Sequence, residues 1–288
     1  MSANRFTIQP LSTHAGAEVH GLDLSESMGP QTVHEIRAAL HKNGVLFFRD
    51  QDLDPEKLIQ VASFFGEPTP YPLLKGLKDY PEVTVVSKME HERVNFGGIW
   101  HSDTTYLKIP PKISFLYALE VPEKGGDTLF SNQSVAFETL SRPIQQLLSQ
   151  LTCINQAGNP AVSATREERI REASSGVSVS ELNAEHPAVR THPETGKTIL
   201  YLNRAHTVGF RELSMDEGNA LLEFLFRHQN QPEFCCRFSW CKGSLALWDN
   251  CTMQHYPVND YHGQRRIMHR VTLKGERPFL DRSKLPFS

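Results

Sequence analysis

A histidine and an aspartate stand two positions apart in the segment Trp100-His101-Ser102-Asp103-Thr104. In extended backbone such side chains project from the same side, so one segment can offer an imidazole nitrogen and a carboxylate oxygen to a single metal ion. Two histidines and one carboxylate form the facial triad of non-haem Fe(II) oxygenases, which leaves open positions for oxygen and a bidentate co-substrate. A histidine from elsewhere in the chain would have to complete such a site.

The two-residue spacing is a weak signal by itself, because it arises often by chance and such side chains are usually just hydrogen-bonded. Two segments near the C-terminus strengthen it. The segment 248–255, Trp-Asp-Asn-Cys-Thr-Met-Gln-His, follows a predicted strand and ends in His255. The segment 264–270, Gln-Arg-Arg-Ile-Met-His-Arg, begins the next strand.

Two arginines of this last strand are predicted to point into the protein. Period-two alternation places Arg266, Met268 and Arg270 on one face of the strand. A buried arginine is costly unless it meets an anion, and its planar fork suits a carboxylate, sulfonate or phosphate. The strand therefore predicts anion binding, and pairing with an internal acid is the alternative, more so for Arg270 than for Arg266.

Caps and apolar spacing predict three helices. The first covers 31–43 and is ended by the glycine that follows. The second covers 55–65 and is ended by Gly66, with Asp54 as its N-cap and a proline at its first position. The third begins after Ser214, which opens a capping box, and covers 215–226.

Predicted strands dominate the last third of the chain, and no βαβ alternation or repeat is present. We therefore expect a mainly β fold with α additions, and a double-sheet jelly roll meets that description. The polar segments 89–98 and 158–185 predict, respectively, a mobile loop before the His-x-Asp segment and a lid or surface excursion. The predicted strands are 45–48, 83–86, 189–191, 198–202, 233–240, 244–248 and 266–273.

The composition argues against several classes of partner. The 288 residues carry a formal net charge of -3 with a pI near 6.5, so no nucleic acid or anionic membrane is expected to bind. No signal peptide or bilayer-length apolar run is visible, so we expect a soluble, cytoplasmic protein that acts on small molecules.

The cysteines are expected to be reduced thiols. There are five, an odd number, in a chain too large to need disulfide bonds. A zinc site of Cys235, Cys236 and Cys241 is disfavoured, because the usual C-x-x-C pair is missing and adjacent strand residues point to opposite faces.

With these segments in order, the sequence resembles the TauD/TfdA family, the taurine dioxygenase-like Fe(II)- and 2-oxoglutarate-dependent oxygenases. The resemblance spans almost the whole chain, and separated motifs in the right order are far more specific than any one of them. The motifs are His20-Gly21-Leu22-Asp23-Leu24, Phe48-Arg49-Asp50-Gln51, Phe65-Gly66-Glu67, Trp100-His101-Ser102-Asp103, Gly125-Gly126-Asp127-Thr128-Leu129, Trp248-Asp249-Asn250, Gln254-His255-Tyr256 and Gln264-Arg265-Arg266-Ile267-Met268-His269-Arg270.

The resemblance implies a fold and a reaction. The fold is a double-stranded β-helix, a jelly roll, formed by a single domain over 1–288. The reaction uses O2 to convert 2-oxoglutarate to succinate and CO2 and hydroxylates a C–H bond of a small substrate. Asp103 favours hydroxylation over halogenation, because related halogenases leave this carboxylate out so that a halide can bind.

The resemblance also implies the residues of the site. His101, Asp103 and His255 would be the ligands of Fe(II). Thr128 and Arg266 would hold 2-oxoglutarate, with the arginine on its distal carboxylate.

Four residues are predicted to contact the primary substrate. Arg270 is similar to the residue that binds the anionic head group in sulfonate-oxidising members. Tyr71, Asn95 and His206 stand in segments that differ from those of taurine-oxidising members. These departures argue against taurine and leave a small organic anion, such as a sulfonate, sulfate ester or carboxylate. For His206 a structural, hydrogen-bonded role is an equal alternative.

Two other functions remain open on sequence grounds. A zinc hydrolase could use the same three ligands, and a non-catalytic β-barrel could bind a small molecule at the same place. The dicarboxylate pocket of Thr128 and Arg266 favours the oxygenase, since a hydrolase has no need of it. The resemblance also implies a homo-oligomer, a dimer or a tetramer, although no assembly signal is visible.

Overall fold

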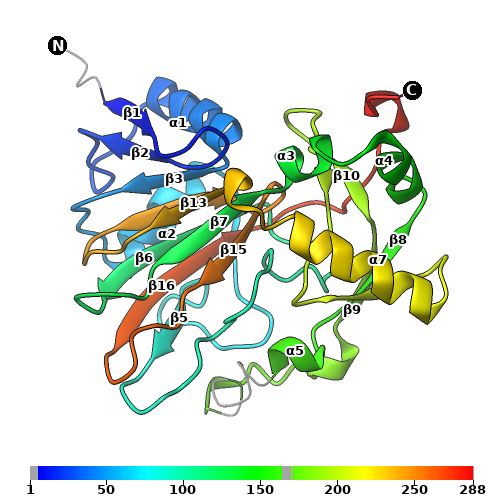
Figure 1. Ribbon diagram of the computed structural model, residues 1–288. Coiled ribbons are helices and arrows are strands. Elements are labelled where there is room, and N and C mark those ends of the chain that lie inside the picture. Colours follow the sequence, from blue (N-terminus) through cyan, green and yellow to red (C-terminus); the bar gives the residue numbers. More distant parts are fainter. Residues whose placement is uncertain (1–5, 164–169, 171, 288) are drawn as a thin grey trace.

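A mixed sheet of eight strands forms the larger part of the core in the computed structural model, which describes residues 6–163, 170 and 172–287 (Figure 1). Its strands are β1 (Thr7–Pro10), β2 (Ala17–His20), β3 (Val45–Phe48), β4 (Pro68–Thr69), β5 (Thr84–Lys88), β6 (Ile113–Glu120), β14 (Leu245–Asp249) and β16 (Arg266–Leu273). Their order is β1-β2-β3-β14-β6-β16-β4, and β5 also pairs with β16. Only the β2–β3 pair is parallel.

A second, antiparallel sheet faces the first. It has the order β13-β7-β15, with β7 at Thr128–Asn132, β13 at Cys235–Phe238 and β15 at Met253–Pro257. Aromatic side chains fill the space between the sheets. Phe47 stacks on Phe238 with ring centroids 3.9 Å apart, and Trp248 meets Phe130 at 5.7 Å. This double-sheet core with helical additions agrees with the predicted architecture.

Two helices cover the outer face of the larger sheet. They are α1 (Pro30–Asn43) and α2 (Pro55–Ser63), and they share one apolar cluster with the side chains on that face. Strand alternation explains the division: Phe47 points to the second sheet, whereas Phe48 points to the helices.

Helix α1 ends where the sequence predicts, at the glycine Gly44. Helix α2 begins as predicted, since Asp54 accepts a hydrogen bond from the backbone of Lys57. It ends at Ser63, earlier than the predicted residue 65, because the N–H groups of Phe64 and Phe65 bond to carbonyls three residues back and tighten the last turn.

A second apolar cluster lies beside the sheets and is built mostly from the segment between β7 and β13. Here the capping box of Ser214 and Glu217 opens a helix, as predicted, and the strands predicted at 189–191 and 198–202 pair as an antiparallel hairpin. Figure 1 shows these elements at the right of the molecule. They are α3 (Gln133–Glu138), α4 (Arg142–Leu148), α7 (Met215–His228), β8 (Thr152–Gln156), β9 (Asn183–Pro187), β10 (Val189–Thr191), β11 (Thr198–Leu200) and β12 (Thr207–Phe210).

The segment 158–185 was expected to form a lid or surface excursion, and residues 164–169 and 171 of it lie outside the described residues. The described part contains the helix α5 (Pro160–Ser163) and the 3-10 helix η1 (Val179–Glu181). Ser174 forms a β-bridge with Leu74, and the hydroxyl of Ser175 donates to the carbonyl of Pro72. This part of the segment therefore packs against residues 72–74, and its role as a lid stays a prediction.

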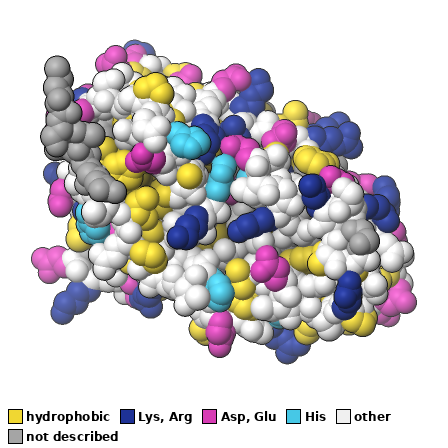
Figure 2. Space-filling view, turned by 90° about the horizontal axis from the view of Figure 1, so that it is seen from above, with side chains coloured by type: hydrophobic (Ala, Val, Ile, Leu, Met, Phe, Trp, Pro, Cys, Tyr) yellow, Lys and Arg dark blue, Asp and Glu magenta, His cyan; other side chains and the backbone are white. Residues whose placement is uncertain are grey.

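Other sequence predictions differ in detail from the structure. The strand predicted over 233–240 is shorter, because 232–234 forms the 3-10 helix η2 (Pro232–Phe234). Another 3-10 helix, η3 (Arg282–Lys284), lies near the C-terminus. The five cysteines are free thiols, as predicted. No helix in the described part of the chain is long and apolar enough to cross a membrane. Acidic and basic side chains are interspersed on the face seen in Figure 2.

Gly44 fixes the angle between α1 and β3, and its replacement is our first prediction. Its φ is 74°, and a Cβ atom there would lie 2.3 Å from the sulfur of the buried Met253. We expect Gly44→Ala to lower the free energy of unfolding by about 2–4 kcal/mol, because backbone strain and overpacking add. Urea unfolding measures the loss.

Gly263→Ala is the matched control. Gly263 has a similar φ of 79° but nothing within 4 Å of the added Cβ atom. Only the backbone cost of about 1–2 kcal/mol is expected there. Equal losses in the two variants would show that Met253 does not restrict this position.

Candidate functional site

Two reciprocal backbone hydrogen bonds join His101 to His255. The N–H of His101 donates to the carbonyl of His255 at 3.0 Å, and the N–H of His255 donates back at 2.8 Å. His101 lies in the loop between β5 and β6, and His255 lies in β15. This isolated bridge brings the two imidazole rings to 4.1 Å between centroids.

Asp103 joins the two histidines in one cluster of potential metal ligands. The ligand atoms of the three buried residues all lie within 4.8 Å of one another. Nδ1 of His101 donates to the carbonyl of Ile99 at 2.7 Å, which places the ring's lone pair on Nε2. That Nε2 faces Oδ1 of Asp103 at 3.8 Å. The three residues predicted as ligands therefore converge.

Electrostatics keep Asp103 and His255 in the protonation states that a metal needs. Burial raises the pKa of Asp103, but the charge of Arg270, the two histidines and a hydrogen bond from Ser114 outweigh it and lower the pKa to about 2. Burial, together with His101, holds the pKa of His255 well below 6.5. One carboxylate and two neutral imidazoles are the donor set of the facial triad.

Arg266 and Thr128 lie together beside this cluster, as predicted. Nη2 of Arg266 is 3.5 Å from Oγ1 of Thr128, and the indole N–H of Trp240 donates to that same oxygen at 2.9 Å. Nε of Arg266 is buried and has no hydrogen-bond partner among the described residues. A buried guanidinium without an acid partner is the expected form of an anion site.

Arg270 is paired with an internal acid, which was the alternative left open by the sequence. The acid is the ligand candidate itself, since Nη1 of Arg270 donates to Oδ1 of Asp103 at 3.2 Å. The guanidinium also lies over the ring of Tyr71, 4.3 Å from its centroid. Nε and Nη2 of Arg270 have no hydrogen-bond partner among the described residues. Part of the guanidinium is thus available to a second anion.

Asn95 and His206 are placed behind the cavity and do not line it. The amide of Asn95 donates to the carbonyls of Pro257 and Val258 and accepts from the hydroxyl of Tyr261. Nδ1 of the fully buried His206 lies 3.0 Å from Oγ1 of Thr105. Its ring is 6.2 Å from that of His101.

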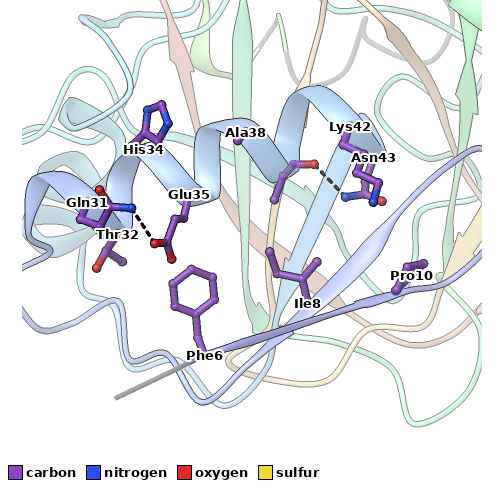
Figure 3. A pocket seen from close by; sticks show the side chains of 11 residues that line it. Phe6, Ile8, Pro10, Gln31, Thr32, His34, Glu35, Ala38, Lys42 and Asn43 are labelled. Carbon is purple, nitrogen blue, oxygen red and sulfur yellow. Dashed lines mark hydrogen bonds between the residues drawn. The ribbon is translucent and has the colours of Figure 1, made fainter. Parts of the chain in front are cut away.

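The cavity between these residues is small, about 40 Å³. A larger hollow of about 900 Å³ lies elsewhere, between α1 and the N-terminal strand (Figure 3). In that hollow Gln31 bonds to Glu35, and the amide of Asn43 donates to the carbonyl of Ala39. No group of metal-ligating side chains was found there among the described residues. We therefore place the chemistry at the smaller cavity, which is lined by Val86, Phe96, His101, Leu116, Thr128, Phe130, Trp248, His255, Pro257, Arg266 and Arg270.

A second cluster, His192 with Asp249 and Cys251, also has metal-ligating side chains. Nε2 of His192 bonds to Asp249 at 2.7 Å, and its Nδ1 accepts from the backbone of Glu194 and Thr195. Both ring nitrogens are therefore engaged, and the cluster is a structural network that anchors the hairpin turn. Cys235, Cys236 and Cys241 are not among the groups of metal-ligating side chains found in the described residues.

Several neighbours of the site carry no signal in the sequence. Ser114 donates to Asp103 from 11 positions away, and Trp240 holds Thr128 from 112 positions away. A serine in a strand, or a tryptophan just after one, is ordinary by itself. Only the folded arrangement gives these residues their place in the site.

Replacing Arg270 tests the charge balance around Asp103 and is our second prediction. Arg270→Gln leaves a buried carboxylate without its cation, which costs about 3–5 kcal/mol. We expect a loss of this size at pH 7 in urea unfolding with a chelator present. The control Arg237→Gln breaks the pair with Asp127, whose arginine side chain is 53% exposed. It should cost less than about 1 kcal/mol.

The free energy of unfolding of Arg270→Gln should depend on pH differently from that of the wild type. The pKa of Asp103 in the folded protein, about 2, lies below its ordinary 3.8, so its stabilising contribution exists above pH 3.8 and is lost as the pH falls toward 2. Without Arg270 the carboxyl loses the largest of the causes that lower its pKa, so this pKa should rise. The variant should then lose less stability through this group than the wild type does as the pH falls from 3.8 toward 2. Parallel stability curves for variant and wild type would contradict this account.

Known proteins are similar to this chain in both sequence and fold. The family model described as "Taurine catabolism dioxygenase TauD, TfdA family" matches residues 7–272. An alkylsulfatase of Acinetobacter baylyi is 35% identical, over 93% of this chain and 85% of the relative. An alpha-ketoglutarate-dependent sulfate ester dioxygenase of Pseudomonas putida is 32% identical, over 94% of this chain and 90% of the relative. The crystal structure of a taurine dioxygenase from Burkholderia xenovorans superposes with a TM-score of 0.81 at 36% identity, covering 95% of this chain and 90% of that one.

Proposed function

The chain belongs to the TauD/TfdA family of dioxygenases, and from this premise we propose that His101, Asp103 and His255 hold Fe(II) in a 2-oxoglutarate-dependent dioxygenase. The enzyme hydroxylates a small organic anion and releases succinate and CO2. One observation carries the assignment of residues: a cluster of two imidazoles and one carboxylate lies beside two buried arginines that keep unpartnered nitrogens.

The donor set fits iron. The carbonyl of Ile99 fixes the tautomer of His101, so that Nε2 keeps its lone pair. Asp103 is ionised, and His255 is neutral. Bound Fe(II) supplies the oxygen chemistry, in which 2-oxoglutarate is oxidised and the substrate is hydroxylated, while the protein supplies binding, orientation and charge.

Thr128 and Arg266 are proposed to bind the distal carboxylate of 2-oxoglutarate. The indole of Trp240 donates to Oγ1 of Thr128, so the threonine's own hydroxyl hydrogen remains to be donated to a carboxylate oxygen. The unpartnered Nε of Arg266 adds a charged donor. A dicarboxylate therefore satisfies groups that are otherwise buried at a cost.

Arg270 is proposed to bind the anionic head of the primary substrate. The ring of Tyr71 packs against the guanidinium, and Phe96, which lines the cavity, packs against the ring of Tyr71. These two rings belong to an apolar cluster with Leu73, Leu74 and Tyr106. A charged head next to an apolar cluster fits a sulfate ester or sulfonate with a carbon chain. Relatives that carry the names alkylsulfatase and sulfate ester dioxygenase support this class.

Asn95 and His206 are proposed to shape the pocket from behind it. Asn95 ties its loop to the end of β15 through two carbonyls. His206 packs against the ring of Tyr106, 4.9 Å between centroids. Direct substrate contact by either residue stays a prediction.

The hydrolase and the non-catalytic binding protein are not favoured, because several relatives are named alpha-ketoglutarate-dependent dioxygenases. We propose in addition that the protein is a cytoplasmic homo-oligomer. Light scattering after size-exclusion chromatography measures the number of subunits.

Our third prediction concerns the metal and the co-substrate. Anaerobic Fe(II) with 2-oxoglutarate should give the wild type a weak visible charge-transfer band, and O2 should then yield succinate when a substrate is present. His255→Ala should lose the band and the product. His228→Ala, on α7 and outside the cluster, should keep both. A wild type that neither shows the band nor binds 2-oxoglutarate would exclude the proposed function.

Our fourth prediction concerns the substrate. Succinate formation is measured over sulfate esters, sulfonates, carboxylates and phosphonates with alkyl chains of increasing length. An alkyl sulfate or sulfonate should be the best substrate, and Arg270→Ala should raise its KM by about 100-fold, since a lost buried charge-assisted contact is worth about 3 kcal/mol. The KM for 2-oxoglutarate should change little. An uncharged best substrate that Arg270→Ala turns over normally would refute the anion assignment.

A further inference from the structure

Asp103 is held from two sides by buried polar side chains, those of Ser114 on β6 and Asn250 after β14. We propose that Ser114 and Asn250 are positioning residues that fix Asp103 for metal binding. Ser114 acts on the carboxylate, and Asn250 acts on the backbone. The proposal rests on the proposed function for the identity of the metal site.

The hydroxyl of Ser114 donates to Oδ2 of Asp103 at 2.7 Å. Ser114 is fully buried, so no water competes for this bond. It lies in the middle of the larger sheet, since β6 has β14 on one side and β16 on the other. The donor is therefore placed by a rigid element.

The two oxygens of Asp103 have different neighbours because of this bond. Oδ2 is occupied by Ser114, whereas Oδ1 faces Nε2 of His101 at 3.8 Å and accepts from Arg270 at 3.2 Å. Ser114 thus selects which oxygen points toward the histidines. Hydrogen bonds to ligating carboxylates orient the ligand and tune its affinity for the metal.

The side chain of Asn250 forms hydrogen bonds with the peptide groups on both sides of Asp103. Its carbonyl oxygen accepts from the N–H of Asp103 at 2.7 Å, and its NH2 group donates to the carbonyl of Asp103 at 3.1 Å and to that of Pro111 at 2.9 Å. Asn250 is fully buried. It therefore links the loop between β5 and β6, which carries His101 and Asp103, to the end of β14 through three hydrogen bonds.

The residue after Asp103 shows why such support is needed. Thr104 has φ of 48°, in the left-handed region that a β-branched residue rarely adopts. Its buried hydroxyl has no hydrogen-bond partner among the described residues. A backbone in this conformation persists only where its surroundings fix it. The bonds from Asn250 to Asp103 supply that constraint directly before the strained residue.

The decisive comparison uses serine hydroxyls. Ser114→Ala removes only the bond to Oδ2, and we expect it to weaken Co(II) binding by about 10–100-fold in calorimetric titration of the full-length apoprotein. Ser131→Ala is the matched control, because Ser131 is also fully buried in a strand but donates to the carbonyl of Gln229. It should leave the Co(II) affinity unchanged. Ser114→Thr restores the hydroxyl and should recover most of the affinity.

Asn250→Ala gives a second measurement. It should weaken Co(II) binding at a temperature where circular dichroism shows the variant to be folded, and the visible spectrum of bound Co(II) should differ from that of the wild type. If Ser114→Ala binds Co(II) as tightly as the wild type, or loses no more affinity than Ser131→Ala, the positioning role is excluded. A wild type that fails to bind Co(II) at all would instead count against the proposed function.

Discussion

The backbone bridge between His101 and His255 is the contact on which the arrangement of the site depends. The two residues are far apart in the sequence, and two reciprocal hydrogen bonds place their rings side by side. Two paired strands in a sheet are normally joined by many backbone hydrogen bonds. Here the loop between β5 and β6 is tied to β15 by this isolated backbone bridge and by side-chain hydrogen bonds of Ser102 and Asn95. The bonds from Asn250 to Asp103 add an attachment to the end of β14.

The sheets also determine how the buried charges of the site are compensated. Period-two geometry turns Arg266 and Arg270 inward together, where desolvation is costly. Asp103 partly compensates for Arg270, and Arg270 keeps the carboxylate of Asp103 ionised despite its burial. The ion pair thus stabilises both buried charges. Arg266 takes no part in this pair and lies beside Thr128 and Trp240, where an anion would complete its hydrogen bonding.

Short sequence patterns predicted the features that depend on residues close together in the sequence. The capping box of Ser214, the glycine after α1 and the full extent of β16 agree with the structure, because each rests on neighbours in sequence. The resemblance to a family supplied the ligand set, which the structure brings together. The central strand β6 was not predicted, since a continuous apolar run has no distinctive period. The contacts of Ser114 and Asn250 could not be predicted, because they join segments that only the fold brings together.

The pairing of Arg270 with Asp103 has a consequence for the charge of the ligands that the site can enclose. Arg266, Arg270 and Asp103 are buried, and together they carry one net positive charge. A divalent cation makes the interior more positive, and a dicarboxylate co-substrate returns it to a single positive charge. One monoanion then brings the enclosed charge to neutrality, whereas a dianion would overshoot it and a neutral molecule would leave it unbalanced. Because uncompensated charge is costly in a medium of low polarity, this balance would favour a singly charged primary substrate.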